Sequence, residues 1–417
     1  MGPIALFDKS FLQSLSLDES VWFSHFFTPL VCPLFYVETL ADLEKAVRAG
    51  RTPEQEVGII ARKFPELSAV PNVYHGNAAL GELLGHTVAM KRVPLRGGGR
   101  VVTRNGERGI VFDESAEAEA FARWQRSEFL EVERGMARNW RAAVQGIDLQ
   151  AIATQLRDMG IDASTCRTLE DARGMAQALV SARDKTFAQI ALVMAVVNVP
   201  RQYQDTVVER WKIAGYRPLI QHAPYVAHVV NVELFFRFAL AAHLIGSERA
   251  SNRVDMAYLN YLPFCMMFVS SDDLHRRCAP HFMGERQQFV WGPDLKEDLQ
   301  RINQHFMELP EDVKERGIMS FAHAPPKRDG SLVRELRSTF MGAGYDDRPP
   351  VAIQKDEKNA ELVRQLTAWT EAPAASTEMA RDVGANTRMT AIQRKVHKKK
   401  GSWYQVPRDL PQKEQED

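Results

Sequence analysis

The stretch RVDMAYLNYLPFCMMFVSSDD, from Arg253 to Asp273, decides the expected fold. It begins as a short helix with Asp255 in its first turn, and Pro263 closes this helix because proline disfavours helical geometry in the residue before it. The unbroken apolar run from Phe264 to Val269 then has the length of a strand buried on both faces. Two serines and two aspartates follow this run. Since ligands of open α/β sheets bind at the carboxyl ends of the strands, we expect a negatively charged site at that edge.

The amino-terminal residues repeat this order of strand, acid and helix. The apolar run from Pro3 to Phe7 ends at Asp8, and apolar residues at helical spacing follow Ser10. If the two strands lie side by side in a parallel sheet, Asp8 and Asp272 would lie about 5 Å apart. The amino-terminal stretch and the stretch from Arg253 to Asp273 therefore predict one shared acidic edge of the sheet.

A third acidic position follows the apolar run from Leu30 to Val37. Glu38 and Asp42 are four residues apart and share one face of a predicted helix. Glu38 comes directly after the apolar residues, which places it at the boundary of the core. Asp42 and Glu44 are expected to be solvated surface charges instead.

Composition narrows the class of protein. The 417 residues include 53 Lys and Arg and 53 Asp and Glu, so the net charge indicates no class of partner. Four scattered cysteines are too few for a disulfide framework or a zinc ribbon, which favours buried free thiols in a reducing compartment. The residues from Met1 to Phe7 lack the basic region of a signal peptide. The longest apolar stretch, Tyr225 to Gly246, carries charged residues that a membrane span would not tolerate, so we expect a cytoplasmic protein without a membrane segment.

Two segments are rich in basic residues. Between Met90 and Phe112, β-branched residues surround three glycines and the pair Asn105-Gly106, which predicts a hairpin excursion of two or three strands. No Gly-Lys-Ser/Thr follows these glycines, so a phosphate loop is disfavoured. Arg388 to Lys400 contains six Lys and Arg, and Trp403 follows. Such a cluster either grips phosphates and stacks on bases, or forms a flexible solubilising tail.

The rest of the chain has mainly helical patterns. Asp113 to Gln145 suits a long arm or a helical hairpin, with Asp113 or Ser115 as its cap. Phe187 to Val197 is almost wholly apolar and is therefore predicted to be a buried helix.

The acids at these strand ends point to a cation. An acid after a strand is often only a helix cap, but several carboxylates on neighbouring strand ends repel one another. At least one of them then takes up a proton unless a cation is bound. Mg²⁺ and Mn²⁺ prefer oxygen ligands and keep several waters, so a few carboxylates suffice. We therefore expect an Mg²⁺ or Mn²⁺ site.

Three segments, FDKSFL (7–12), VETLADLEK (37–45) and DMAYLNYLPFCMMFVSSDD (255–273), resemble the PIN-like nucleases. They are similar to that family's opening strand and turn, its glutamate-bearing helix, and its closing helix and strand. The resemblance implies an α/β fold, a PIN-like three-layer core with a central parallel sheet, heavily elaborated by helices. It departs from the family at Lys9, where a small residue is usual. The catalytic and metal-binding acids that it implies are Asp8, Glu38, Asp255 and Asp272.

The resemblance also implies roles for other residues. Ser10 and Ser270 would orient the acids, and Asp273 would be an auxiliary metal ligand. The ion would lower the pKa of a bound water that attacks the scissile phosphorus. The expected activity is that of a metal-dependent nuclease, an endoribonuclease acting on RNA, with an antitoxin or another protein as a further partner. Candidate nucleic-acid-binding residues are Arg253, Arg96, Arg100, Arg394, Lys395 and Lys398.

On this basis the chain divides into four expected parts. Residues 1–90 hold the N-terminal part of the PIN-like core, 91–150 the hairpin and long-helix insertion, 151–290 a helical segment with the C-terminal part of the core, and 291–417 a C-terminal extension with a basic tail. Two other functions stay open. One is a catalytically inactive PIN-like module that binds nucleic acid or protein. The other is an aspartate-nucleophile phosphohydrolase, whose family needs a second acid where Ser10 stands.

Overall fold

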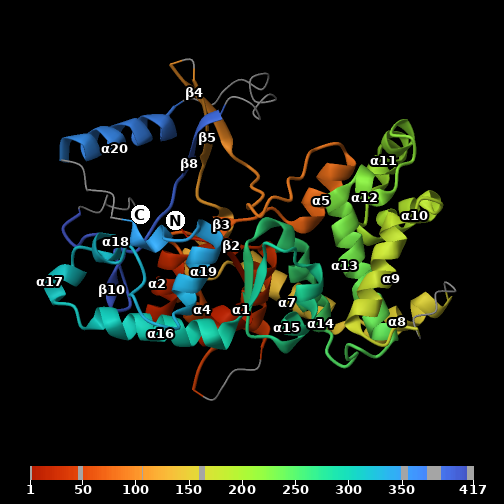
Figure 1. Cartoon of the computed structure of the whole chain (residues 1–417), viewed down its shortest axis with the longest axis horizontal. Coiled ribbons are helices and arrows are strands. Elements are labelled where there is room, and N and C mark those ends of the chain that lie inside the picture. Colours follow the sequence, from red (N-terminus) through yellow and green to blue (C-terminus); the bar gives the residue numbers. More distant parts are fainter. Residues whose placement is uncertain are drawn as a thin grey trace.

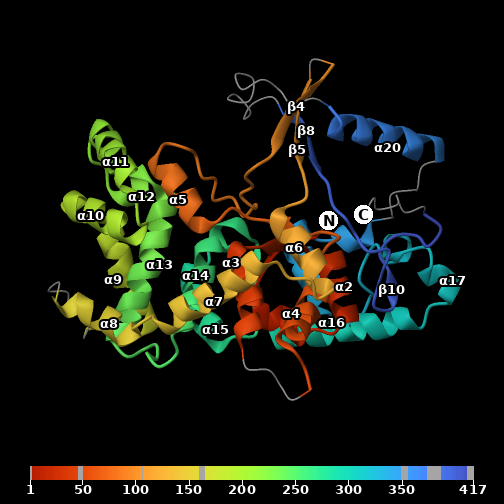
Figure 2. The ribbon, with the colours of Figure 1, turned by 180° about the vertical axis from the view of Figure 1, so that it is seen from behind.

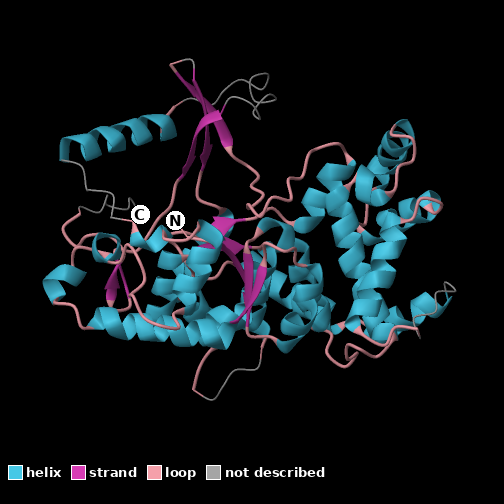
Figure 3. Cartoon of the chain, viewed as in Figure 1, coloured by secondary structure: helices cyan, strands magenta, loops and turns pink. Residues whose placement is uncertain are grey.

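A five-stranded, all-parallel sheet lies at the centre of the computed structural model (Figure 3). The structure describes residues 2–45, 50–105, 107–158, 165–348, 356–372 and 387–410. The strands of the central sheet, in spatial order, are β3 (Val70–Pro71), β2 (Thr28–Val31), β1 (Ile4–Phe7), β6 (Met267–Ser270) and β7 (Gln288–Trp291). The expected α/β fold with a central parallel sheet is confirmed.

The strand order reverses between β1 and β6. From β1 the chain adds β2 and β3 on one side, and it later adds β6 and β7 on the other. Phe7 of β1 pairs with Val269 of β6, so the residues that follow both strands leave the sheet at the same edge. In open α/β sheets, such a reversal opens a crevice at the carboxyl ends of the strands, and ligands bind there. The predicted adjacency of the first strand and the strand near residue 268 is confirmed.

Helices surround this sheet (Figure 1). In Figure 2, α6 and α7 run alongside α4 and α3. The helices are α1 (Lys9–Ser14), α2 (Leu17–Phe26), α3 (Pro33–Leu40), α4 (Pro53–Arg62), α5 (His75–Leu83), α6 (Ala116–Gln125), α7 (Glu131–Gln145), α8 (Leu149–Asp158), α9 (Leu169–Ser181), α10 (Thr186–Val196), α11 (Arg201–Ile213), α12 (Leu219–His222), α13 (Pro224–Ala241), α14 (Asn252–Ala257), α15 (Asp273–Cys278), α16 (Gly292–Met307), α17 (Glu311–Lys314), α18 (Ile318–Phe321), α19 (Leu332–Met341) and α20 (Asp356–Thr370). The 3₁₀ turns are η1 (Ala41–Glu44), η2 (Tyr258–Phe264), η3 (Ala279–Phe282) and η4 (Tyr345–Asp347).

The stretch that decides the fold differs from its expected form in one detail. The helix does not stop at Pro263, because α14 continues as the 3₁₀ turn η2 to Phe264. The strand therefore begins at Met267 and ends at Ser270, rather than running from Phe264 to Val269. A 3₁₀ turn is tighter than an α-helix and accommodates the proline near its end. All four residues of β6 are buried, as expected for a central parallel strand.

One helix prediction is wrong. The nearly all-apolar α10 was expected to be buried, but Phe187 is 74% exposed. The helix lies at the periphery of the helical part formed by α8 to α13, and its buried residues include Gln189 and Val193 (Figure 1). Apolar composition predicts burial only when partners cover every side, and among the described residues α10 packs mainly on one side.

A small second sheet projects from the body (Figures 1 and 2). The expected hairpin is confirmed as β4 (Arg100–Arg104) and β5 (Glu107–Phe112). A third strand, β8 (Thr387–Ile392), comes from the C-terminal part of the chain and pairs parallel to β5. Val102, Val111 and Trp369 of α20 are buried in a separate apolar cluster under this sheet.

Two expectations from composition can be compared with the described residues. The four cysteines are buried and free, as predicted. None of the described helices is both long enough and apolar enough to cross a membrane.

Candidate active site at the reversal of strand order

Asp8 lies at the carboxyl end of β1 and caps α1. Its Oδ1 accepts a hydrogen bond from the Phe11 N–H at 2.9 Å. Its Oδ2 accepts hydrogen bonds from Ser10 Oγ at 2.6 Å and from Ser270 Oγ at 2.8 Å. Burial raises the pKa of Asp8, but His275 and these hydrogen bonds outweigh burial and lower the pKa below its ordinary value. Asp8 is therefore a buried, ionised carboxylate that both expected orienting serines contact.

His275 of α15 completes the surroundings of Asp8, and sequence reasoning missed it. Its Nδ1 lies 2.8 Å from Ser270 Oγ and 3.4 Å from Asp8 Oδ2, so the serine is the closer partner. Its Nε2 lies 2.8 Å from the backbone oxygen of Asp255. Burial lowers the pKa of His275, but the neighbouring Asp8 and Asp255 outweigh burial and raise it to about 9. The signal in the sequence was a histidine three residues after Asp272, in the first turn of the helix that follows the strand.

Asp255 and Asp272 are linked to Asp8 through shared partners, because Ser270 Oγ accepts from the Asp272 N–H and His275 contacts the Asp255 backbone oxygen. Asp272 caps α15, where its Oδ1 accepts a hydrogen bond from the Leu274 N–H at 2.7 Å. Burial raises the pKa of Asp255 to about 6, and repulsion from Asp272 and Asp8 adds to this increase despite the attraction of His275. Ser270 and His275, which contact Asp8 and the two segments that carry Asp255 and Asp272, place the three acids in one region of the fold. No donor among the described residues hydrogen-bonds to the Asp255 carboxylate.

Glu38 reaches the same region from α3. Its Oε2 accepts a hydrogen bond from the hydroxyl of Tyr258, a partner that the sequence did not indicate. Burial raises the pKa of Glu38 to about 7, and repulsion from Asp255 and Asp8 acts in the same direction, while the attraction of Lys9 and the hydrogen bond from Tyr258 oppose the increase. Two segments far apart in the sequence, residues 4–38 and 255–272, thus contribute the four predicted acids to the same side of the sheet.

Lys9 and Asp42 form an internal pair beside this site. Lys9 Nζ lies 2.9 Å from Asp42 Oδ1 and 3.1 Å from the backbone oxygen of Glu38. Asp42 is only 5% exposed, so the expectation that it is a solvated charge is wrong. Glu44 is exposed, as expected. Lys9 therefore neutralises a buried acid.

The carboxylates are the type of ligand that a hard cation prefers, but they are not arranged around one ion position. Glu38, Asp255 and Asp272 are partly exposed oxygen donors, and the raised pKa of two of them reflects burial and repulsion that a cation would offset. In the described ranges, however, no three His, Cys, Asp or Glu side chains are close enough together to hold an ion as they stand. Asp273, the expected auxiliary ligand, is exposed and pairs with Arg276 at 2.7 Å.

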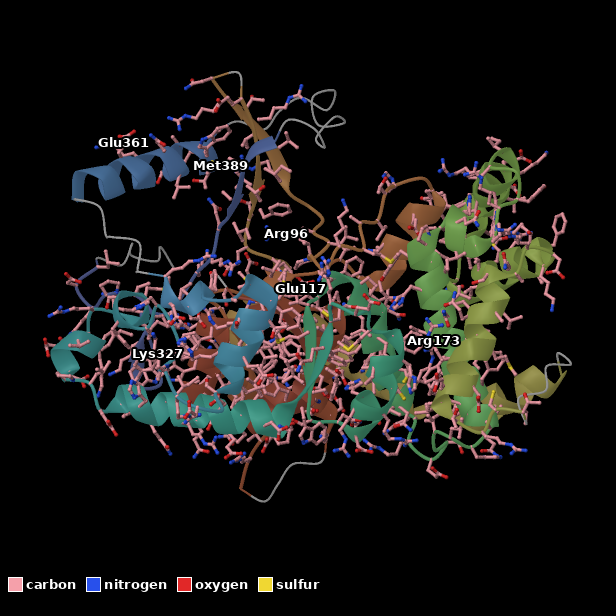
Figure 4. All side chains as sticks on the ribbon, viewed as in Figure 1. Arg96, Glu117, Arg173, Lys327, Glu361 and Met389 are labelled. Carbon is pink, nitrogen blue, oxygen red and sulfur yellow. The ribbon has the colours of Figure 1, made fainter. Side chains whose placement is uncertain are left out.

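The basic residues expected to contact nucleic acid near the core make internal contacts. Arg253 pairs with the buried Glu233 at 2.6 Å. Arg96 lies over the Phe112 ring at 5.1 Å, and Figure 4 shows it at the foot of the projecting sheet. Arg100 donates to the backbone oxygens of Thr370 and Ala372, each at 2.8 Å, and so ties α20 to β4.

The C-terminal basic segment is also attached to the body. Arg394 donates to the Leu67 backbone oxygen at 3.0 Å, and Lys398 donates to the Arg408 oxygen at 2.8 Å. Lys395 lies 3.6 Å from Glu114 and remains largely exposed. Trp403 is fully buried, so its ring is not available to stack on bases. The described part of this segment, residues 388–410, is therefore attached to the body and is not a free tail; we call it the C-terminal strap.

The comparisons with known proteins add no relative. No family model, no curated protein and no solved structure matches this chain.

Proposed function

We propose that this protein is a metal-dependent nuclease that hydrolyses phosphodiester bonds in RNA, as an endoribonuclease of PIN-like type. The observation that supports the proposal is the location of Asp8, Glu38, Asp255 and Asp272 around the carboxyl ends of β1 and β6, at the reversal of strand order. Asp8 and Asp272 also cap helices, but capping does not account for Glu38, which lies near the end of α3 at the edge where α/β sheets bind ligands. Raised carboxylate pKa values in such a crevice favour a functional role.

The exposure and the hydrogen bonds of each acid indicate its role in this proposal. Glu38, Asp255 and Asp272 are partly exposed and would hold Mg²⁺ or Mn²⁺ through oxygen. Such an ion, when bound, activates water and neutralises charge on the phosphate. Asp8 fixes the base of the site, because Ser10, Ser270 and the Phe11 N–H hold its carboxylate in place. This chemistry needs no side-chain nucleophile.

The test is RNA cleavage by Asp272→Asn in Mg²⁺ and in Mn²⁺. Asparagine still caps α15, so the helix is retained while the charge is lost. Loss of one ligand charge is expected to cost about 3 kcal/mol of transition-state stabilisation, or about 100-fold in rate. Asp273→Asn is the matched control, because the neighbouring carboxylate is exposed and paired with Arg276.

Asp8→Asn gives an independent measurement and is expected to lose activity as well. Undiminished cleavage by both Asp8→Asn and Asp272→Asn would eliminate the nuclease proposal.

One observation favours the second candidate, a catalytically inactive PIN-like module that binds nucleic acid or protein. Within the described residues no three ligand side chains are already assembled around an ion position. This alternative predicts salt-sensitive RNA binding without cleavage in any divalent metal. Cleavage that Asp272→Asn abolishes and Asp273→Asn retains would exclude it.

A further inference from the structure

Internal donors already occupy the carboxylate of Asp8. Its Oδ2 accepts hydrogen bonds from Ser10 and Ser270, and its Oδ1 accepts one from the Phe11 N–H. A carboxylate offers about four acceptor positions, so three are filled. His275 Nδ1 approaches Oδ2 at 3.4 Å, and Asp8 is only 4% exposed. Little of this carboxylate is left for an ion.

The hydrogen bonds around His275 explain this inward orientation. Its Nε2 faces a backbone oxygen, which only accepts, so Nε2 carries a hydrogen. Ser270 Oγ donates to Asp8, accepts from the Asp272 N–H at 3.0 Å, and meets His275 Nδ1. The fully buried ring therefore ties Asp8, by way of one serine hydroxyl, to the backbone of Asp255.

Resting on the proposed metal-dependent function, we propose that His275 is a positioning residue that holds the Asp8 carboxylate inward. Asp8 then acts on the metal site indirectly, through Ser270, whose hydroxyl donates to Asp8 and accepts from the N–H of Asp272. Asp8 is not itself a ligand. The other acids contrast with it: Asp255 has no described donor, and Asp272 is bonded through only one oxygen. Outer partners of this kind commonly contribute about 10- to 100-fold to metal affinity or activity.

His228 provides a matched control. Its Nε2 lies 2.9 Å from the backbone oxygen of Leu259, four residues beyond the Asp255 oxygen that His275 contacts. Its ring lies near Tyr225 and Phe282, not against a carboxylate. Both histidines hold the same α14–η2 segment, but only His275 contacts Asp8. If each histidine acted only by supporting this backbone segment, His275→Gln and His228→Gln should lower the Mn²⁺ affinity equally.

The experiment is calorimetric titration of the full chain with Mn²⁺, with the melting temperature of each variant recorded. His275→Gln is expected to lower Mn²⁺ affinity by about 10-fold, and His228→Gln by less than about 2-fold. In the Asp8→Asn background, His275→Gln should add no further loss, because residues that act through one another are not additive. Asp255→Asn should lower the affinity more than Asp8→Asn does. Ser270→Ala, which removes the linking hydroxyl, should behave as His275→Gln does and serves if that variant fails to fold.

Three outcomes separate the inference from the function on which it rests. Equal losses from His275→Gln with and without Asp8→Asn would show that the histidine does not act through Asp8. Loss of Mn²⁺ binding in Asp8→Asn as complete as in Asp255→Asn would make Asp8 a ligand. Either result overturns the inference and leaves the nuclease proposal intact. Absence of Mn²⁺ binding in the unsubstituted chain would instead remove the metal-dependent function, and the inference with it.

Discussion

At the acidic edge, no described donor hydrogen-bonds to the Asp255 carboxylate, whereas in the C-terminal strap the guanidinium of Arg394 donates to a backbone oxygen. The strap appears in the sequence as a cluster of like charge, whereas the acids of the edge are far apart in the sequence and are gathered by the fold. Basic side chains of the strap are bound by acceptors within the chain: His397 contacts the Glu66 carboxylate at 3.0 Å, and the buried Lys400 donates to the Phe64 backbone oxygen. At the acidic edge, the described cations nearest to the four acids include His275 and Lys9, and Lys9 is already paired with Asp42. A charge cluster is therefore a strong candidate for ligand binding only where internal partners do not already neutralise it.

The largest effect expected in the strap comes from Trp403→Ala. Trp403 is fully buried, its ring centroid lies 4.7 Å from that of Trp22, and both indoles donate to Asn303. The cavity left behind should lower the free energy of unfolding by about 3–5 kcal/mol. Chemical denaturation measures this change. If the variant kept its stability but bound RNA less well, the strap would be a binding surface after all, and the contrast with the acidic edge would fail.

A smaller effect is expected from His397→Gln, and it depends on pH. His397, Lys400 and the adjoining hydrogen bonds outweigh burial and lower the pKa of Glu66 to about 2, and the bond to Glu66 raises the pKa of His397. The pair stabilises the fold fully between the unfolded pKa values of 4.5 for Glu66 and 6.5 for His397. The stabilisation falls as pH rises through the raised pKa of His397, and also as pH falls toward the lowered pKa of Glu66.

Near pH 5.5, the free energy of unfolding of the unsubstituted chain should exceed that of His397→Gln by about 0.2–1 kcal/mol, as measured by thermal unfolding. The difference is small because His397 is half exposed. The difference should shrink as the pH rises through the raised pKa of His397, because the imidazole loses its charge there. A difference that does not change with pH would mean that packing, not charge, attaches the strap.

The smallest effect is expected from Lys395→Ala combined with Lys398→Ala. Lys395 lies near Glu114 and Lys398 bonds to the Arg408 oxygen, so the two lysines are assigned to internal contacts. The slope of log RNA affinity against log salt concentration should therefore be the same in the double variant as in the unsubstituted chain. Each lost phosphate contact would reduce that slope by about 1, so a decrease of about 2 would restore the nucleic-acid role of this segment.

The sequence predicted the acids better than their partners. Asp8 and Asp272 were predictable because an apolar run that ends in an acid is a local pattern, and parallel strands align such ends. Tyr258 was not predictable, since it bonds to Glu38 across 220 residues. His275 had a local signal in its position after Asp272, but its proximity to Asp8 depends on the pairing of two strands far apart in the sequence. Asp42 was misjudged for the same reason, because its partner Lys9 is 33 residues away.

By itself, the sequence determined the parallel sheet, the meeting of the first strand with the strand near residue 268, the hairpin, and the acids at one edge. These follow from apolar periodicity and strand-end chemistry, which are local properties of the chain. Only the tertiary structure decided which charges remain available. It turned Asp8 inward beneath His275, attached the basic segment to the body, and left α10 partly exposed. Pairing and burial depend on segments distant in sequence, and no local pattern records them.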